Sequence, residues 1–131
     1  MKADKLQYSA RTTNFTTTST SYADVTDVTV TFTPDVASNL LVLANVCCSH
    51  SDASGVSSFV VDLDGVDQGD DPLMISSQPA GATGNLDYTV STSLWITGVA
   101  ASAHTIKLQA KVGAGTVTVR FANLTVIPFA S

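Results

Sequence analysis

The sequence predicts an all-β protein: an antiparallel β-sandwich, jelly-roll-like, with seven to eight strands. Apolar and polar residues alternate with the period of a half-buried strand over residues 28–33, 106–112 and 117–121. Turn residues separate such segments at intervals of roughly ten residues, and no segment has the capped periodicity of an amphipathic helix. The chain of 131 residues fits one domain.

The first strands are predicted in the order in which they occur. Residues 24–33 alternate valine and phenylalanine with threonine. Residues 40–46 form a nearly continuous apolar run, which indicates a strand covered on both faces. A third strand over 56–63 ends at Asp64 and Gly65, a tight-turn signal because glycine tolerates a positive φ.

The second half of the chain supplies the remaining strands. They are expected over residues 73–76, 86–99, 106–112 and 117–121. After the last of these, Leu124 and Val126 continue the apolar pattern on the opposite parity. A β-bulge near Ala122 and Asn123 would return the strand to the core face.

Residues 1–23 are predicted to form an extended N-terminal arm outside a sandwich domain of residues 24–131. Threonine and serine dominate the second half of this segment, and β-branched threonine favours extended backbone. Without apolar alternation the arm cannot bury much of itself, so we expect it to be disordered or ordered only against a neighbour. Phe15 and Tyr22 have nothing local to pack on and are candidate contacts with an adjacent subunit.

Composition and charge exclude several classes of function. Only 13% of the residues are charged, the formal net charge is −5, and the six basic residues form no run. Binding of nucleic acid requires a basic patch, and anionic membranes require a similar one, so neither partner is expected. The sequence has no secretory signal and no apolar stretch long enough to span a membrane, which predicts synthesis and folding in the cytoplasm.

The adjacent residues Cys47 and Cys48 are the only cysteines. Neighbouring residues of a strand point to opposite faces, so one thiol should enter the core and the other should face outward. We interpret both as reduced thiols that pack as small apolar side chains.

A cluster of aspartates raises the question of a calcium site. Asp62, Asp64 and Asp67 could supply oxygen ligands. The spacing departs from the EF-hand template, because Gly65 is the fourth residue counted from Asp62 and no glutamate follows near the loop. The alternative is a solvated hairpin whose aspartates favour the turn.

No catalytic apparatus is predicted, and no cofactor is expected. The sequence lacks the G-x-S-x-G elbow of a hydrolase. His50 is placed in a loop and His104 at a turn before a strand, without a nucleophile and carboxylate at matching positions. The protein is therefore not expected to be an enzyme.

Trp95, the only tryptophan, has two interpretations. Its apolar neighbours Leu94 and Ile96 favour a place in the core. A position on the surface would make it an interface anchor or a platform on which a sugar ring stacks.

Several segments resemble small β-sandwich modules of tailed-phage virions. These segments are residues 26–34, 39–44 and 92–112. Such modules serve as head decoration proteins or as tips of tail fibres, and they are often trimeric jelly rolls. The resemblance implies no catalytic residues. Because the sequence contains no repetitive or coiled-coil shaft, it is more similar to the decoration type.

The resulting hypothesis is a capsid decoration, or cement, protein of a phage head. Its expected partners are copies of itself in a homotrimer and the major capsid protein, and its expected location is the outer capsid surface of the virion. The alternative is a tail-fibre or receptor-binding tip that recognises a glycan on the host surface.

Overall fold

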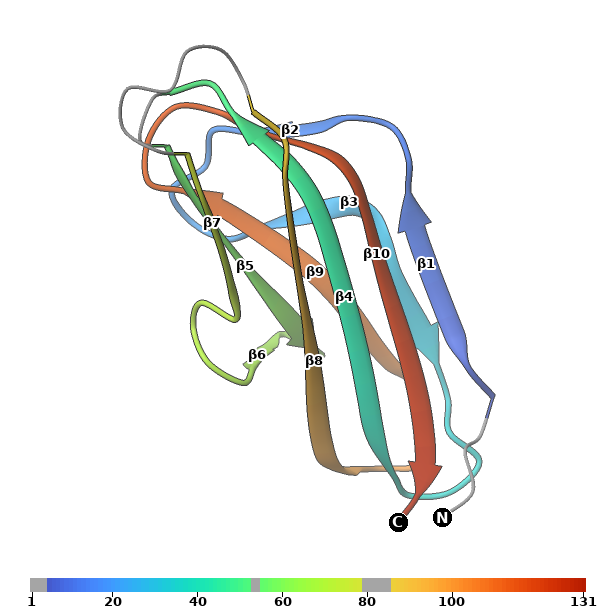
Figure 1. Cartoon of the computed structure of the whole chain (residues 1–131). Coiled ribbons are helices and arrows are strands. Elements are labelled where there is room, and N and C mark those ends of the chain that lie inside the picture. Colours follow the sequence, from blue (N-terminus) through green and yellow to red (C-terminus); the bar gives the residue numbers. More distant parts are fainter. Residues whose placement is uncertain (1–4, 53–54, 79–85) are drawn as a thin grey trace.

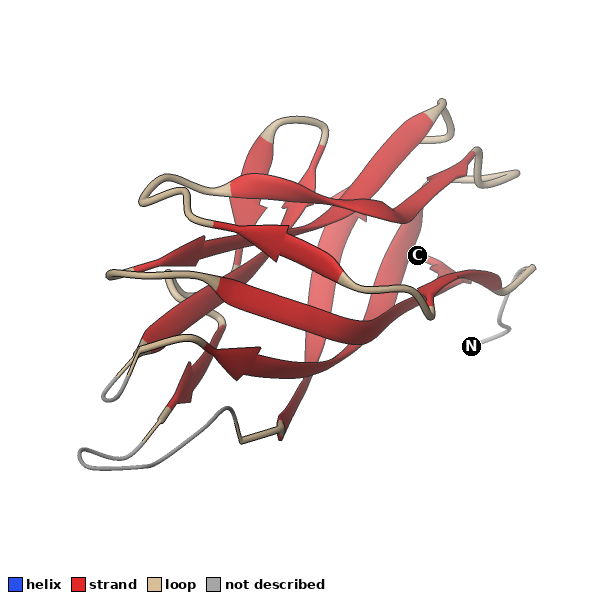
Figure 2. Cartoon of the chain, turned by 90° about the horizontal axis from the view of Figure 1, so that it is seen from above, coloured by secondary structure: helices blue, strands red, loops and turns tan. Residues whose placement is uncertain are grey.

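The computed structural model describes residues 5–52, 55–78 and 86–131. Two antiparallel sheets pack face to face as a jelly-roll β-sandwich (Figures 1 and 2), and the described residues contain no helix. This confirms the predicted fold class, but the described residues form ten strands rather than seven to eight. The additional strands are short and lie at residues 7–11, 15–17 and 66–68, which lack the apolar alternation used for the prediction. No helix in the described ranges has the length and apolar character required to cross a membrane.

Each sheet has five strands. Sheet A has the order β1 (Gln7–Arg11), β10 (Val117–Ala130), β4 (Ser38–His50) and β8 (Tyr88–Val99), with β2 (Phe15–Thr17) also paired to β10. Sheet B has the order β3 (Ala23–Phe32), β9 (His104–Val112), β5 (Val56–Leu63) and β6 (Val66–Gln68), with β7 (Met74–Ser77) also paired to β5. The two longest strands, β4 and β10, lie side by side in the middle of sheet A.

The core lies between the two sheets and is built from alternate residues of the long strands. Val42 of β4 and Leu124 of β10 meet Phe59 of β5 and Leu108 of β9 in one buried cluster. All four side chains have at most 1% of their surface exposed. The apolar alternation in the sequence therefore marks the core, as predicted. Cys48 is also fully buried while Cys47 is half-buried on the other face, which confirms the predicted division of the two thiols.

The bulge expected in the last strand exists, but it lies slightly earlier than predicted. The pairing of β10 with β4 shifts register between Val119 and Phe121, and Ala122 then occupies a buried position. Phe121 consequently points outward and is 39% exposed. The sequence could not locate the extra residue of the bulge, because a bulge at either place returns the side chain of Leu124 to the core face.

The segment predicted as an arm is extended, but its described part belongs to sheet A of the same molecule. Strand β1 pairs along β10, with Ser9 opposite Leu124, and β2 pairs with the first part of β10. Backbone pairing with an available strand edge requires no apolar alternation, which is why the pattern of the sequence did not reveal it. Residues 1–4 of the predicted arm lie outside the described residues.

Arg11 fastens this N-terminal segment to sheet B. Its guanidinium donates hydrogen bonds to the carbonyl oxygens of Thr13 at 2.9 Å, Asn14 at 2.9 Å and Thr26 at 3.2 Å. It also pairs with the carboxylate of Asp27 at 3.0 Å. Asp27 has a φ of 69° and lies where the pairing of β3 with β9 shifts register. Arg11 therefore connects the turn at Thr13 and Asn14 to this irregular part of β3.

Candidate functional site

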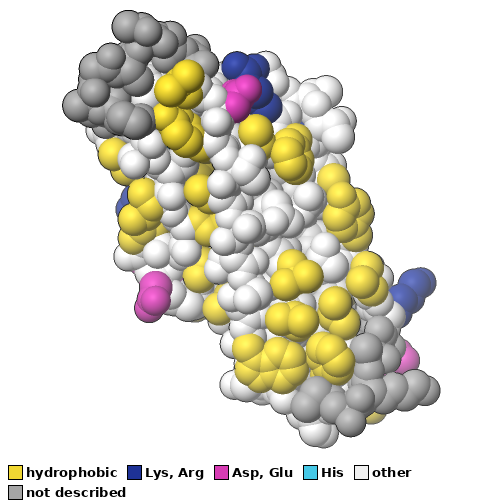
Figure 3. Space-filling model, in the orientation of Figure 1, with side chains coloured by type: hydrophobic (Ala, Val, Ile, Leu, Met, Phe, Trp, Pro, Cys, Tyr) yellow, Lys and Arg dark blue, Asp and Glu magenta, His cyan; other side chains and the backbone are white. Residues whose placement is uncertain are grey.

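The outer face of sheet A is the candidate functional site. Its outward side chains, here called the A face, belong to four neighbouring strands. They are Tyr8, Ala10, Asn39, Leu41, Leu43, Asn45, Cys47, Thr89, Ser91, Ser93, Trp95, Phe121, Asn123, Thr125, Ile127 and Phe129. None of these side chains is charged. Arg120, the extra residue in the bulge of β10, also points outward and forms an ion pair with Asp87, next to the first residue of β8, at one end of the face. Figure 3 views the molecule from this side, and the charged groups that it shows lie toward the margins and the upper end of the face.

One end of the A face is apolar and aromatic. Ile127, Leu41 and Trp95 form a row across β10, β4 and β8, since each is paired with the next in the register. The rings of Trp95 and Phe129 lie 5.6 Å apart between centroids. Trp95 is 45% exposed, so its interpretation as a core residue is wrong. The parity of β8 turns Ile96 inward and Trp95 outward, although both carry apolar side chains.

The middle of the A face is polar but uncharged. Asn45 of β4 and Asn123 of β10 are opposite one another, and Nδ2 of Asn45 donates a hydrogen bond of 2.7 Å to Oδ1 of Asn123. Thr125 and Ser93 lie in the adjacent row, on either side of Leu43. The far end returns to apolar groups, where Phe121 is paired with Cys47. The face therefore alternates apolar, polar and apolar zones along its strands.

The outer face of sheet B differs in its charge. Lys107 and Gln109 of β9 donate hydrogen bonds of 2.9 Å and 2.8 Å to the carboxylate of Asp24 on β3. Both hydrogen bonds lower the pKa of Asp24, and the one from Gln109 has the larger effect. Interface centres are depleted of charged residues, whereas solvated faces carry them. The contrast between the two sheets identifies the A face as the candidate interaction surface.

The two aromatic residues proposed as contacts from the arm both touch their own chain. Phe15 is half-buried against the core, and the guanidinium of Arg11 lies 5.8 Å from the centre of its ring. The hydroxyl of Tyr22 donates a hydrogen bond of 2.5 Å to Asp71, and the ammonium of Lys111 lies 4.2 Å from its ring centre. Burial, together with the hydrogen bond to Asp71, raises the pKa of Tyr22. A role of either residue between subunits stays a prediction.

The aspartates considered as calcium ligands shape the hairpin between β5 and β6. Asp64 and Gly65 have positive φ values of 52° and 88°, as the predicted tight turn requires. A carboxylate oxygen of Asp62 accepts a hydrogen bond of 2.9 Å from the amide of Gly65. Asp67 is exposed on β6, paired with Asp62. Within the described ranges, no three His, Cys, Asp or Glu side chains come together in a group that could hold a metal ion.

His104 links this hairpin to the loop before β9. Its Nδ1 lies 2.6 Å from one carboxylate oxygen of Asp64, and its Nε2 lies 2.9 Å from the carbonyl oxygen of Ala100. The other carboxylate oxygen of Asp64 accepts a hydrogen bond of 2.8 Å from the amide of Thr105. Because both ring nitrogens face acceptors, the doubly protonated ring donates to both. His104, which the sequence placed at a turn before a strand, therefore fastens that turn to the hairpin through an ion pair.

Protonation of His104 should make the stability of the fold depend on pH. The hydrogen bond to Asp64 raises the pKa of His104, and the hydrogen bonds from His104 and Thr105 lower the pKa of Asp64. The ordinary pKa values are 3.8 for the carboxyl and 6.5 for the imidazole, and the stabilisation of the fold by this ion pair is fully present at pH values between them. It is lost as pH rises through the raised pKa of His104. We therefore expect the free energy of unfolding to fall more from about pH 6 to about pH 8 in the natural protein than in Asp64→Asn.

Urea unfolding at the two pH values measures this effect. The other histidine, His50, has a pKa lowered by burial and contributes with the opposite sign, but it is present in both proteins and cancels in the comparison. Equal changes with pH in the natural protein and in the variant would show that the contact with Asp64 does not stabilise the fold.

His50 occupies a different environment from the one predicted. It is the last residue of β4 rather than a loop residue, and it is 2% exposed. Its Nε2 lies 2.9 Å from the hydroxyl of Ser57, which lies 4.0 Å from the thiol of Cys48. Burial lowers the pKa of His50 and raises the pKa of Cys48. Since Ser57 and Cys48 are both 0% exposed, this group is closed to solvent.

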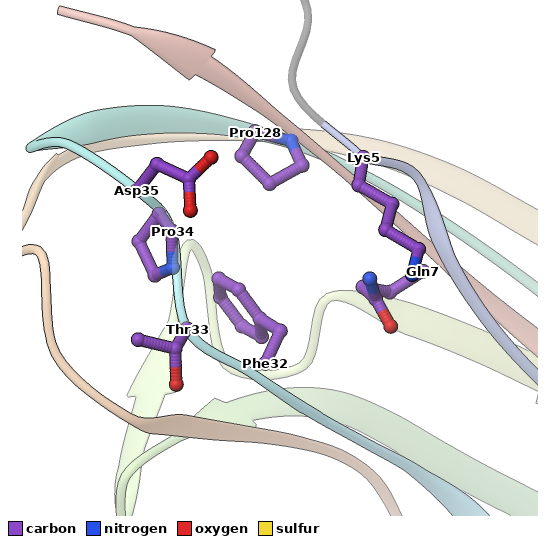
Figure 4. A pocket seen from close by; sticks show the side chains of 7 residues that line it. All are labelled: Lys5, Gln7, Phe32, Thr33, Pro34, Asp35 and Pro128. Carbon is purple, nitrogen blue, oxygen red and sulfur yellow. The ribbon is translucent and has the colours of Figure 1, made fainter.

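A cavity of about 230 Å³ lies at the end of the sandwich, near the end of β3 (Figure 4). Its lining consists of Lys5, Gln7, Phe32, Thr33, Pro34, Asp35 and Pro128. Figure 4 shows Lys5 and Gln7 on one side and Asp35 with Pro34 on the other. Two prolines and a phenylalanine form the apolar part of the lining, and Lys5, Gln7, Thr33 and Asp35 form its polar part.

Comparison with known proteins identifies the fold through structure alone. No family model matches the sequence, and no relative was found among curated proteins. The structure of Eiger TNF from S. frugiperda is similar over 99% of this chain and 95% of its own, with 12% identity and a TM-score of 0.61. The VP2 subviral particle of infectious bursal disease virus is similar over 98% of this chain, with 12% identity and a TM-score of 0.57.

A second structure from the same virus, of its Gx strain, has 10% identity over 98% of this chain and a TM-score of 0.56. The chain spans about a third of the length of these viral chains, 34% and 33%. At these identities the likeness concerns the fold alone, and it places the chain among jelly-roll β-sandwiches.

Proposed function

We propose that this protein is a structural protein of a virion, and specifically a capsid decoration protein that binds the outer surface of a phage head and stabilises it. The observation that carries the proposal is the A face: a sheet surface with one ion pair at one end and an exposed tryptophan at the other, on a fold shared with VP2 of infectious bursal disease virus. The partners in this proposal are further copies of the chain in a homotrimer and the major capsid protein. The location is the outer surface of the virion.

The mechanism is burial of surface. Removal of apolar surface from water contributes about 25 cal/mol per Å². Hydroxyl and amide groups cost less to desolvate than charges, so a face of threonine, serine and asparagine around apolar groups suits a permanent contact. Because a capsid repeats each site many times, multivalent contacts gain avidity across the lattice.

The pairing of the basic residues supports a partner other than nucleic acid or a membrane. Four of the six basic residues form ion pairs with aspartates of the same chain. These pairs are Arg11 with Asp27, Lys107 with Asp24, Lys111 with Asp71, and Arg120 with Asp87. Partly neutralised cations scattered over several strands do not provide the basic patch that phosphate binding requires.

A stabilising role predicts a change in the capsid itself. Particles of the cognate phage that carry the protein should withstand a higher temperature and a stronger osmotic shock than particles that lack it, because the added contacts must break before the shell opens. The measurement is release of DNA on heating, followed by dye fluorescence, with purified protein added back to particles that lack it. An unrelated β-sandwich protein at equal concentration is the control. Equal release with and without this protein would contradict the proposal.

The exposed pair of Trp95 and Phe129 favours one alternative, a fibre tip that recognises a glycan. A solvent-exposed tryptophan ring offers a face on which a sugar can stack. Binding to a glycan array that is lost in Trp95→Ala, with the fold retained by circular dichroism, would support this alternative. Such a tip would also leave the heat resistance of the head unchanged.

A further inference from the structure

The A face lacks the features that keep exposed sheets apart. Soluble proteins rarely expose large apolar patches, and those rimmed by polar residues mark interaction sites. On the A face the only charged groups at described positions are Arg120 and Asp87, which pair with each other at the end away from Trp95, whereas the outer face of sheet B carries Asp24 and Lys107 across its strands. Because these two charges neutralise each other, a strongly charged partner would find no net counter-charge here. A second copy of the same face would meet a surface of matching polarity.

The asparagine pair at the centre of the A face complements itself. Asn45 uses one N–H as donor, and Asn123 uses its Oδ1 as acceptor. The Nδ2 of Asn123 and the Oδ1 of Asn45 have no partner among the described residues. One is a donor and the other an acceptor, so the same pair in a neighbouring copy can satisfy both. Polar pairs of this kind specify register in otherwise apolar interfaces.

The size of the face suits an interface of this kind. Its four strands, spaced about 4.8 Å apart, and the roughly eight residues along each of the central strands at about 3.3 Å per residue cover on the order of 500 Å². That area is the larger part of the roughly 800 Å² that each partner of a standard interface buries.

We propose that the A face is the contact between copies of this chain, which assemble around an axis parallel to its strands. Around such an axis, each row of side chains across the A face lies at the same height along the axis in every copy. The row of Trp95 then meets apolar groups, and Asn45 and Asn123 meet their equivalents. This inference deepens the proposed function, on which it rests, because it assigns the surface by which the decoration protein forms its homotrimer.

Asn123→Asp tests the assignment with a nearly isosteric change. The new carboxylate can still accept the hydrogen bond from Asn45, so the sheet should keep its pairing. Copies that meet at this row would bring like charges together, which strongly disfavours an interface. We expect sedimentation equilibrium of the full chain to show a multiple of 13.6 kDa. In the variant we expect a dissociation constant higher by about a hundredfold.

Two further variants complete the experiment. Ile75→Asp adds the same charge at a position of β7 that is 56% exposed on sheet B, and it should leave the oligomer intact. Trp95→Ser removes the exposed ring without disturbing the core, and it should weaken the oligomer even if Asn123→Asp fails to fold. Circular dichroism confirms the fold of each variant. A monomer at every concentration, or an oligomer that neither Asn123→Asp nor Trp95→Ser weakens, would overturn the inference.

The experiment separates this inference from the proposed function. If the natural protein assembles through the A face but does not protect particles against heat, the interface stands and the decoration role fails. If the natural protein protects particles but its oligomer is unaffected by Asn123→Asp and Trp95→Ser, the decoration role stands and the inferred role of the A face is overturned.

Discussion

Phe59→Ala is expected to lower the free energy of unfolding by about 3–5 kcal/mol. Phe59 lies in the middle of β5, is 0% exposed, and is paired with Ala110 on one side and Met74 on the other. Removal of its ring takes away apolar burial and leaves a cavity between two sheets, each held by the pairing of its own strands, so the site cannot collapse fully. Urea denaturation followed by circular dichroism measures the loss.

Phe121→Ala provides the matched control. Phe121 is a strand phenylalanine as well, but it points outward after the bulge in β10 and is 39% exposed. In the dissociated chain its truncation should cost less than about 1.5 kcal/mol, because much of the ring is already in contact with water. Equal losses for the two variants would contradict the position of the bulge, which alone decides that Phe121 leaves the core.

Arg11→Ala is expected to lower the free energy of unfolding by about 2–3 kcal/mol. Three carbonyl oxygens and the carboxylate of Asp27 lose their donor, and the side chain of Arg11 is only 15% exposed. Arg11→Lys should recover little of the loss, since one ammonium cannot reach acceptors that the planar guanidinium contacts in several directions. Thermal unfolding of the two variants, with hydrogen exchange of β1 and β2, measures the effect.

Arg120→Ala is the control for this prediction. Arg120 pairs with Asp87 by an ion pair in which the side chains are 40% and 52% exposed. Exposed ion pairs contribute between about 0 and 1 kcal/mol, so its loss should be much smaller. If Arg11→Ala cost no more than Arg120→Ala, the attachment of the N-terminal strands through Arg11 would be wrong.

Much of the fold could be predicted from the sequence because its signals are local. The alternation along β3, β9 and β10 depends on the two-residue period of a strand, and the structure places Val30, Leu108 and Val119 in the core. Asp64 and Gly65 predict their own tight turn, because the backbone requirement of the turn is met within two residues. The division between Cys47 and Cys48 follows from the same period.

The candidate site could be predicted only in part. The exposed tryptophan was one of two interpretations of Trp95, and its apolar neighbours favoured the other. The A face as a whole has no signature in the sequence, since its members come from segments as distant as Tyr8 and Phe129. Only the lateral order of the strands shows that these residues share one surface. The role of Arg11 also depends on a contact between segments, and no local pattern announces it.

The sequence by itself therefore determined the class of this protein: a sandwich of alternating strands, with few charges and tight turns encoded by aspartate and glycine. Those properties follow from the geometry of single strands and turns. The tertiary structure decided where the strand irregularities fall, that residues 7–11 and 15–17 join sheet A, and that the uncharged side chains gather on one face. These features depend on pairing between distant segments, which hydrogen bonds of the backbone make possible without leaving a residue pattern.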